Sequence, residues 1–146
     1  MATPVAFNFY CMSKNKRIII IDDDANALYG LLAKLRIEGF EAIADEGYDK
    51  MEVLEKIKFF KPNYIILDVA LVKLNGFKIL AEIKADPATS KIPIFVFTDL
   101  SDSDSRKKSL GLGANFYLIK TELNLDEFVV KFKKIINNKE KTNENF

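Results

Sequence analysis

Five side chains with chemical potential follow short apolar segments of this sequence. They are Asp22 and Asp23 after Ile18–Ile21, Asp68 after Tyr64–Leu67, Thr98 after Ile94–Phe97, and Lys120 after Phe116–Ile119. Carboxylates bind hard divalent cations such as Mg²⁺, and hydroxyl and ammonium groups donate hydrogen bonds to phosphoryl oxygens. A carboxylate can also act as a nucleophile and form an aspartyl phosphate. Together, these residue types are suited to metal-assisted phosphoryl transfer.

The apolar segments alternate with segments of helical spacing. The predicted strands are Ile18–Ile21, Phe40–Ala44, Tyr64–Leu67, Ile92–Phe97 and Phe116–Ile119. The predicted helices are Ala25–Glu38, Gly47–Phe60, Phe77–Ala85, a fourth that Ser101 or Asp102 caps and that ends near Gly111 or Gly113, and Leu125–Asn137. This alternation predicts an α/β fold with a doubly wound parallel sheet.

The order of the strands decides whether the special residues meet. With right-handed crossovers, the flavodoxin-like (βα)5 order 2-1-3-4-5 places the first and third strands side by side. Asp22, Asp23 and Asp68 then fall at the topological switch point, where ligands of such sheets bind. Like charges this close are unfavourable, and a bound cation relieves the repulsion. An alternative role for Asp22–Asp24 is to cap the first helix, which Asp24 alone can do.

Composition excludes several classes of protein. The chain has 146 residues, enough for about one domain, and a formal net charge of +1. We therefore expect no contact with nucleic acid and none with a membrane. The absence of histidine excludes histidine triads and histidine metal sites, and the single Cys11 excludes internal disulfides. A cytoplasmic location is the prediction.

The chain divides into three parts. We expect a leader at residues 1–16 that can be disordered, one domain at residues 17–138, and a polar tail at residues 139–146. No output domain is visible in the sequence. The sequence leaves open whether the domain stands alone or belongs to a larger regulator or hybrid kinase.

The ordered set of motifs resembles the receiver domain of two-component response regulators, CheY-like in type. The resemblance runs from about Arg17 to Asn137. The motifs that match are Ile18–Asp24 (IIIIDDD), Tyr64–Asp68 (YIILD), Asn75–Phe77 (NGF), Phe95–Thr98 (FVFT) and Gly113–Lys120 (GANFYLIK). Each motif is common alone, but the spaced set is highly specific.

The resemblance implies a role for each residue of the pocket. Asp68 is the phosphoacceptor, and Mg²⁺ or Mn²⁺ is the cofactor. The implied metal ligands are Asp22, acting mainly through water, Asp23, Asp68 and the backbone carbonyl of Ala70. Thr98 and Lys120 contact the phosphoryl group, and Thr98 and Tyr117 form the switch. The implied function is phosphorylation-controlled signalling, with at most slow self-phosphorylation and self-dephosphorylation rather than enzymatic turnover.

The implied partners are proteins. A histidine kinase or a histidine phosphotransfer protein supplies the phosphoryl group. A downstream target docks on the face formed by the fourth helix, the fifth strand and the fifth helix.

Several positions depart from the family pattern. Thr121 replaces the usual proline after Lys120, and a cis bond before a non-proline residue costs about 2.5–4 kcal/mol, so we expect that loop to differ. Val72 replaces a frequent proline four residues after the acceptor. Asp99 adds a carboxylate that would oppose an incoming phosphoryl group unless it points to solvent. Ala70 and Leu100 occupy positions that tune hydrolysis, and neither side chain can orient water, which predicts a long-lived phosphorylated state.

Two other functions fit parts of the pattern. A haloacid-dehalogenase-type phosphatase would use the Asp-x-Asp of Asp22–Asp24, but Glu122 and Asp126 are poor matches for its remaining metal ligands and Asp68 would have no role. A degenerate receiver would act as a protein–protein interaction module and never accept phosphate. Asp99 and Thr121 are the features that favour this alternative.

Overall fold

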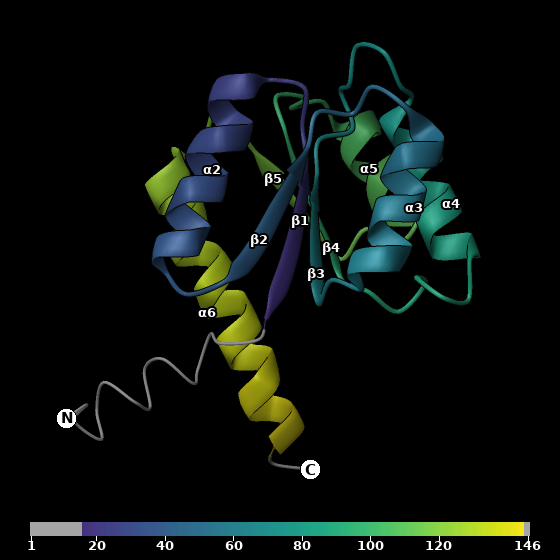
Figure 1. The fold of residues 1–146 in the computed structure, drawn as a ribbon. Helices are drawn as coiled ribbons and strands as arrows, with labels where there is room; N and C mark the ends of the chain where they lie inside the picture. Colours follow the sequence, from purple (N-terminus) through teal and green to yellow (C-terminus); the bar gives the residue numbers. More distant parts are fainter. Residues whose placement is uncertain (1–15, 145–146) are drawn as a thin grey trace, which may run out of the picture.

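The computed structural model describes residues 16–144, with side chains through residue 138. Five strands alternate with five helices (Figure 1). The strands are β1 (Arg17–Ile21), β2 (Glu41–Asp45), β3 (Tyr64–Leu67), β4 (Ile94–Thr98) and β5 (Phe116–Ile119). The helices are α2 (Ala25–Ile37), α3 (Lys50–Phe60), α4 (Gly76–Ala85), α5 (Ser103–Gly111) and α6 (Leu125–Glu144).

All neighbouring strands are parallel, and their order is β2-β1-β3-β4-β5. The flavodoxin-like doubly wound sheet predicted from the alternation is therefore confirmed. Helices α2 and α6 cover one face of the sheet, while α3, α4 and α5 cover the other (Figure 1). This arrangement brings the carboxyl ends of β1 and β3 next to each other.

Alternate residues of each strand enter two separate cores. Ile18 and Ile20 of β1 pack with α2 and α6, whereas Ile19 and Ile21 pack with α3 and α4. The first core is rich in aromatic rings, and Phe95 of β4 lies 4.7 Å from Phe132 of α6, centroid to centroid. A strand buried on both faces needs a continuous apolar segment, which is what the sequence provides.

Polar side chains fix the ends of the helices next to the sheet's carboxyl edge. Asp24 caps α2 by accepting hydrogen bonds from the N–H groups of Asn26 and Ala27. Of the two residues expected to cap α5, Asp102 does so, accepting from the N–H of Ser105. Asp24 therefore takes the capping role, and Asp22 and Asp23 are not needed for it.

Some boundaries differ from the prediction. Helix α3 begins at Lys50 rather than Gly47, because Gly47 has a φ of +73° and Asp49 is the N-cap. Helix α6 continues to Glu144, past the predicted end at Asn137, so the backbone of the predicted tail is largely helical. Residues 1–15 of the predicted leader lie outside the described residues.

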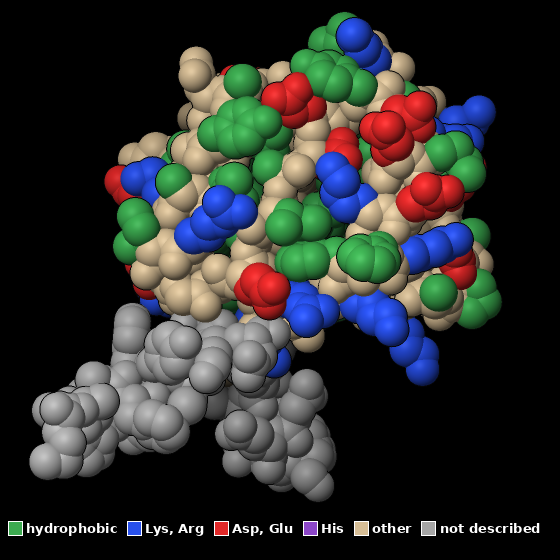
Figure 2. Space-filling model, in the orientation of Figure 1, with side chains coloured by type: hydrophobic (Ala, Val, Ile, Leu, Met, Phe, Trp, Pro, Cys, Tyr) green, Lys and Arg blue, Asp and Glu red, His purple; other side chains and the backbone are tan. Residues whose placement is uncertain are grey.

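Charged side chains of both signs are interspersed on the face shown in Figure 2. Over residues 16–144 every peptide bond is trans, including the bond between Lys120 and Thr121. Within the same range, no helix combines the length and the apolar character that a membrane span needs.

Candidate functional site

Asp22 and Asp68 lie side by side because β1 and β3 pair in register. The pairing aligns Ile21 with Leu67, and the N–H of Asp68 donates to the carbonyl of Ile21 at 2.9 Å. One carboxylate oxygen from each of Asp22, Asp23 and Asp68 lies within 4.8 Å of the others. Asp22 and Asp68 are only 4% and 5% exposed, and Asp23 is half-buried. The fold thus gathers three carboxylates from distant parts of the sequence.

Lys120 joins this acidic group from the end of β5. Its Nζ donates to Oδ2 of Asp22 at 2.5 Å and to Oδ2 of Asp68 at 2.9 Å. The backbone N–H of Lys120 donates to the carbonyl of Thr98 at 2.8 Å, which ties the ends of β4 and β5 together. One ammonium group therefore bridges two buried carboxylates.

Burial and pairing act in opposite directions on this bridge. Burial raises the pKa of Asp22, and the hydrogen bond from Lys120 offsets only part of that effect. Burial by itself would lower the pKa of Lys120, but its hydrogen bonds to Asp22 and Asp68 outweigh it, so that the pKa of Lys120 is raised. Lys120 is therefore held in its charged form next to the two carboxylates.

Backbone N–H groups orient the remaining oxygens. Oδ1 of Asp68 accepts from the N–H of Ala70 at 2.8 Å. Oδ2 of Asp23 accepts from the N–H of Val72 at 2.7 Å. Both donors belong to the loop between β3 and α4. The same loop carries the Ala70 carbonyl, the backbone ligand that the family resemblance implies.

The donor set fits Mg²⁺ or Mn²⁺. Its three side chains offer carboxylate oxygens, which hard divalent cations prefer. The pocket holds three carboxylates and one ammonium group, which pairs with Asp22 and Asp68 only, so it has excess negative charge. Asp22, Asp23 and Asp68 form the one acidic group suited to a metal that was found among residues 16–138.

Thr98 and Tyr117 meet through Leu100. Thr98 is fully buried, and its Oγ1 accepts from the N–H of Leu100 at 3.4 Å. The Tyr117 hydroxyl donates to the carbonyl of Leu100 at 2.7 Å, and this side chain is 6% exposed. The family resemblance implies that Thr98 and Tyr117 form one switch. The structure adds that the backbone of Leu100 contacts both side chains, Thr98 through its N–H and Tyr117 through its carbonyl.

Asp99 lies near the pocket and is exposed. With Asp24, Phe97 and Lys120 it helps to line a surface hollow of about 350 Å³. Its side chain is solvated, which weakens the repulsion that a further carboxylate exerts on an incoming anion. The expected conflict between Asp99 and a phosphoryl group is reduced accordingly.

The acidic residues that a phosphatase would need do not join the site. Glu122 and Asp126 are exposed, and Asp126 forms an ion pair with Lys34 at 2.6 Å. Asp68, which has no role in that alternative, lies among the three clustered carboxylates. The geometry therefore does not support the phosphatase.

Comparison with known proteins gives the family. The model of the response regulator receiver domain matches residues 18–133. This chain belongs to the response regulator receiver domain family. Receiver domains serve phosphorylation-controlled signalling in two-component systems, and they bind Mg²⁺ at an acidic pocket like the one formed here.

Individual relatives agree with this assignment. A probable transcriptional regulator ycf27 of Porphyridium aerugineum is 34% identical over 107 residues, which are 73% of this chain and 42% of that protein. A CheY-like receiver domain protein of Methanospirillum hungatei is 27% identical with a TM-score of 0.73, covering 87% of this chain and 98% of that one.

Another solved receiver was determined with a bound metal. It is the Mn²⁺-bound form of the response regulator Rcp1, 27% identical with a TM-score of 0.65, covering 79% of this chain and 88% of that one. This receiver domain spans less than half the length of the first curated relatives that it matches.

Proposed function

We propose that this receiver accepts a phosphoryl group on Asp68 from a histidine kinase or a histidine phosphotransfer protein. The observation that carries the proposal is the bridge from Lys120 Nζ to Asp22 and Asp68, next to the carboxylate of Asp23. Asp22, Asp23, Asp68 and the Ala70 carbonyl would hold Mg²⁺ or Mn²⁺. A cytoplasmic location stays a prediction.

The chemistry follows from charge and position. An oxygen of Asp68 attacks the phosphorus of the donor phosphohistidine, the new P–O bond forms, and the P–N bond breaks. The imidazole nitrogen keeps the bonding electrons and then takes a proton. The bound cation would neutralise charge on the phosphoryl oxygens, and such neutralisation with positioning carries most phosphoryl transfer.

Lys120 and Thr98 would donate hydrogen bonds to the oxygens of the new phosphoryl group. Lys120 already contacts Asp68 at 2.9 Å, so its ammonium group can follow the charge when Asp68 becomes an acyl phosphate. The Thr98 hydroxyl is a donor at the end of the adjacent strand β4. If Thr98 turns toward the phosphoryl group, its contact with Leu100 changes, and Tyr117 shares that same residue.

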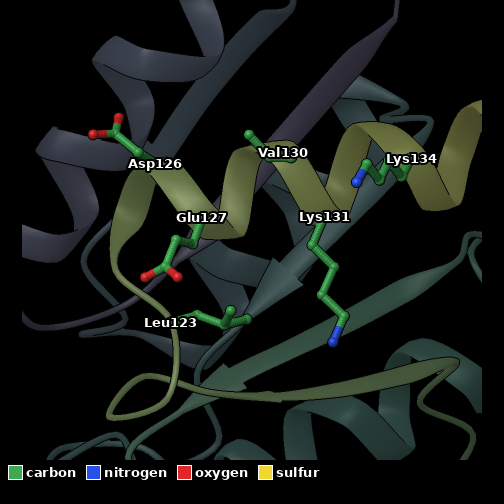
Figure 3. Close-up of a pocket in the computed structure, with 6 residues that line it drawn as sticks. All are labelled: Leu123, Asp126, Glu127, Val130, Lys131 and Lys134. Atoms are coloured by element: carbon green, nitrogen blue, oxygen red, sulfur yellow. The ribbon is translucent and has the colours of Figure 1, made fainter.

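The downstream partner would dock on the face formed by α5, β5 and α6. A surface pocket of about 570 Å³ lies on this side of α6 (Figure 3). It is lined by Leu123, Asp126, Glu127, Val130, Lys131 and Lys134. Glu127 and Lys131 extend from α6 on the side of Leu123, whereas Asp126 points away from it (Figure 3). Val130 is 54% exposed, so the face offers an apolar contact between charges.

Phosphate labelling tests the proposal. The full chain is incubated with acetyl phosphate or phosphoramidate and Mg²⁺, and intact mass reports a phosphoryl adduct. We expect one adduct on the wild type and on Asp104→Asn, an exposed control, and none on Asp68→Ala. Label on Asp68→Ala would show that the acceptor is another residue.

The same experiment separates the receiver from its degenerate alternative. A wild-type chain that binds Mg²⁺ but takes no label from either donor, or from a phosphorylated histidine phosphotransfer protein, would act only as an interaction module. We propose slow self-phosphorylation and self-dephosphorylation as the only reactions of the isolated domain. Multiple turnover of a generic phosphomonoester would contradict that assignment.

A further inference from the structure

We infer that the backbone N–H of Val72 is a positioning group for Asp23, and that it makes metal affinity depend on the loop between β3 and α4. The inference rests on the proposed function, because it concerns how this chain presents a metal ligand. Its starting point is the 2.7 Å hydrogen bond from the Val72 N–H to Oδ2 of Asp23.

Asp23 is held differently from the two other carboxylates. Asp22 and Asp68 share the ammonium group of Lys120, which fixes one oxygen of each. Asp23 is bound instead by an uncharged donor from a different loop. A hydrogen bond to Oδ2 restricts rotation of the carboxylate and leaves Oδ1 for the cation. Such outer contacts of metal ligands tune affinity strongly.

Val72 contributes through its backbone and not through its side chain. The residue is 89% exposed, so its isopropyl group buries little surface on the protein. Proline is frequent at this position in the family that the sequence resembles, and proline has no N–H to donate. This chain therefore has a contact to its metal ligand that a proline at the same position removes.

The neighbours of Val72 hold its N–H in place. Leu71 packs over Gly47, where an added Cβ would lie 3.2 Å from the Leu71 side chain. On the other side, Nζ of Lys73 lies 4.6 Å from the centroid of the Tyr48 ring. Both contacts reach the loop between β2 and α3, so the residues on either side of Val72 pack against a third loop.

The connection continues from Tyr48 to α2. A hydrogen bond with Glu46 is the main cause of the raised pKa of the Tyr48 hydroxyl. Glu46 also accepts a hydrogen bond of 2.7 Å from the hydroxyl of Tyr29, which belongs to α2. A chain of contacts thus links the loop that carries Val72 to the loop after β2 and to α2.

This geometry predicts reciprocal coupling between the cation and the loop. A cation bound by Asp23 and the Ala70 carbonyl would hold the same loop that Val72 ties to Asp23. By linkage, a loop held in this conformation binds the cation more tightly, and the bound cation holds the loop more firmly. Loss of the Val72 N–H should therefore weaken binding even though no metal ligand is changed.

Two substitutions at one position provide the test. Val72→Pro removes the N–H, whereas Val72→Ala keeps it and trims an exposed side chain. Titration calorimetry of the full chain with MgCl₂ should give a dissociation constant at least about tenfold higher for Val72→Pro. Val72→Ala should stay within about twofold of the wild type. Equal affinity of Val72→Pro and wild type overturns the inference.

The outcomes separate this inference from the proposed function. If the wild type does not bind Mg²⁺, the proposed function fails; if all three proteins bind equally, only the positioning role fails. If circular dichroism shows that Val72→Pro is unfolded, amide exchange of the wild type decides instead. The Val72 N–H should be protected, and saturating Mg²⁺ should increase its protection. Unprotected exchange, or no response to Mg²⁺, overturns the inference.

Discussion

The hydroxyl of Tyr117 donates a hydrogen bond to the backbone carbonyl of Leu100, 2.7 Å away. The ring is buried, and the guanidinium carbon of Arg106 lies 6.0 Å from its centroid. Tyr117 therefore points inward and connects β5 to the loop after β4. Burial raises the pKa of the Tyr117 hydroxyl, and the negative charges of Asp102 and Asp68 act in the same direction.

Tyr117 should ionise above the ordinary tyrosine pKa of 10.0. The folded protein then keeps a proton that the unfolded chain loses, so this contribution to stability is full below pH ~10 and is lost as the pH rises through the raised pKa. An alkaline absorbance titration of the wild type minus that of Tyr117→Phe isolates this hydroxyl.

The pKa of the Tyr48 hydroxyl is raised too. The same subtraction with Tyr48→Phe is therefore the control. It should also give a midpoint above the ordinary tyrosine pKa, which would show that the method resolves single tyrosines. A difference midpoint for Tyr117 at or below the ordinary value would mean that the hydroxyl is solvated and not bound to Leu100.

The sheet could be predicted because buried strands leave a direct pattern in the sequence. Ile18–Ile21 and Tyr64–Leu67 are apolar at every position except Tyr64, and both form strands, with β1 starting one residue earlier. Helix ends were less accurate. The apolar stripe of α6 stops near Asn137, whereas the backbone continues as a helix to Glu144. The stripe shows only where the helix packs on the sheet, so it does not mark the end of the helix.

Side-chain contacts of the site could be foreseen only in part. The sequence placed Asp22, Asp68 and Lys120 at strand ends, and register then brings them together. Backbone donors and acceptors carry no residue-type signal, so the contacts of the Ala70 N–H and of the Leu100 carbonyl could not be predicted. Val72 departs from the family pattern as a missing proline, and a residue other than proline brings with it an N–H that can bind a carboxylate.

The phosphorylated state should persist for minutes or longer. Ala70 and Leu100 flank the pocket with side chains that cannot orient an attacking water by hydrogen bonding, and Leu100 packs against the second core. Ala70→Asn adds an amide next to Asp68. We expect dephosphorylation to accelerate a few-fold to about tenfold, because an amide orients water but cannot take its proton. A general base, which does take the proton, contributes a rate increase of ~10²-fold or more.

Loss of the adduct over time, followed by intact mass after removal of the phosphodonor, measures this rate. Leu110→Asn, at a partly exposed position on α5, serves as the control and should leave the rate unchanged. A half-life of seconds for the wild type would contradict the prediction, and so would an Ala70→Asn rate equal to that of the wild type.

Gly76 should be needed for both stability and the pocket. A Cβ added there would lie 2.4 Å from the Cα of Val69 and 2.6 Å from its carbonyl oxygen. These are backbone atoms that cannot rotate away, so Gly76→Ala must displace the segment that follows Asp68. We expect a loss of about 3 kcal/mol in the free energy of unfolding, at the upper end of the usual cost of overpacking.

Gly111→Ala is the matched control, because an added Cβ there meets nothing within 4 Å. Gly111 is the last residue of α5, so alanine should be neutral or stabilise the protein by up to about 1 kcal/mol through its helix propensity. Urea unfolding of both variants measures the difference. Since Val69 directly follows Asp68, Gly76→Ala should also weaken Mg²⁺ binding under native conditions, whereas Gly111→Ala should not. Equal stability and equal Mg²⁺ affinity of the two variants would mean that the close approach of α4 to Val69 does not shape the pocket.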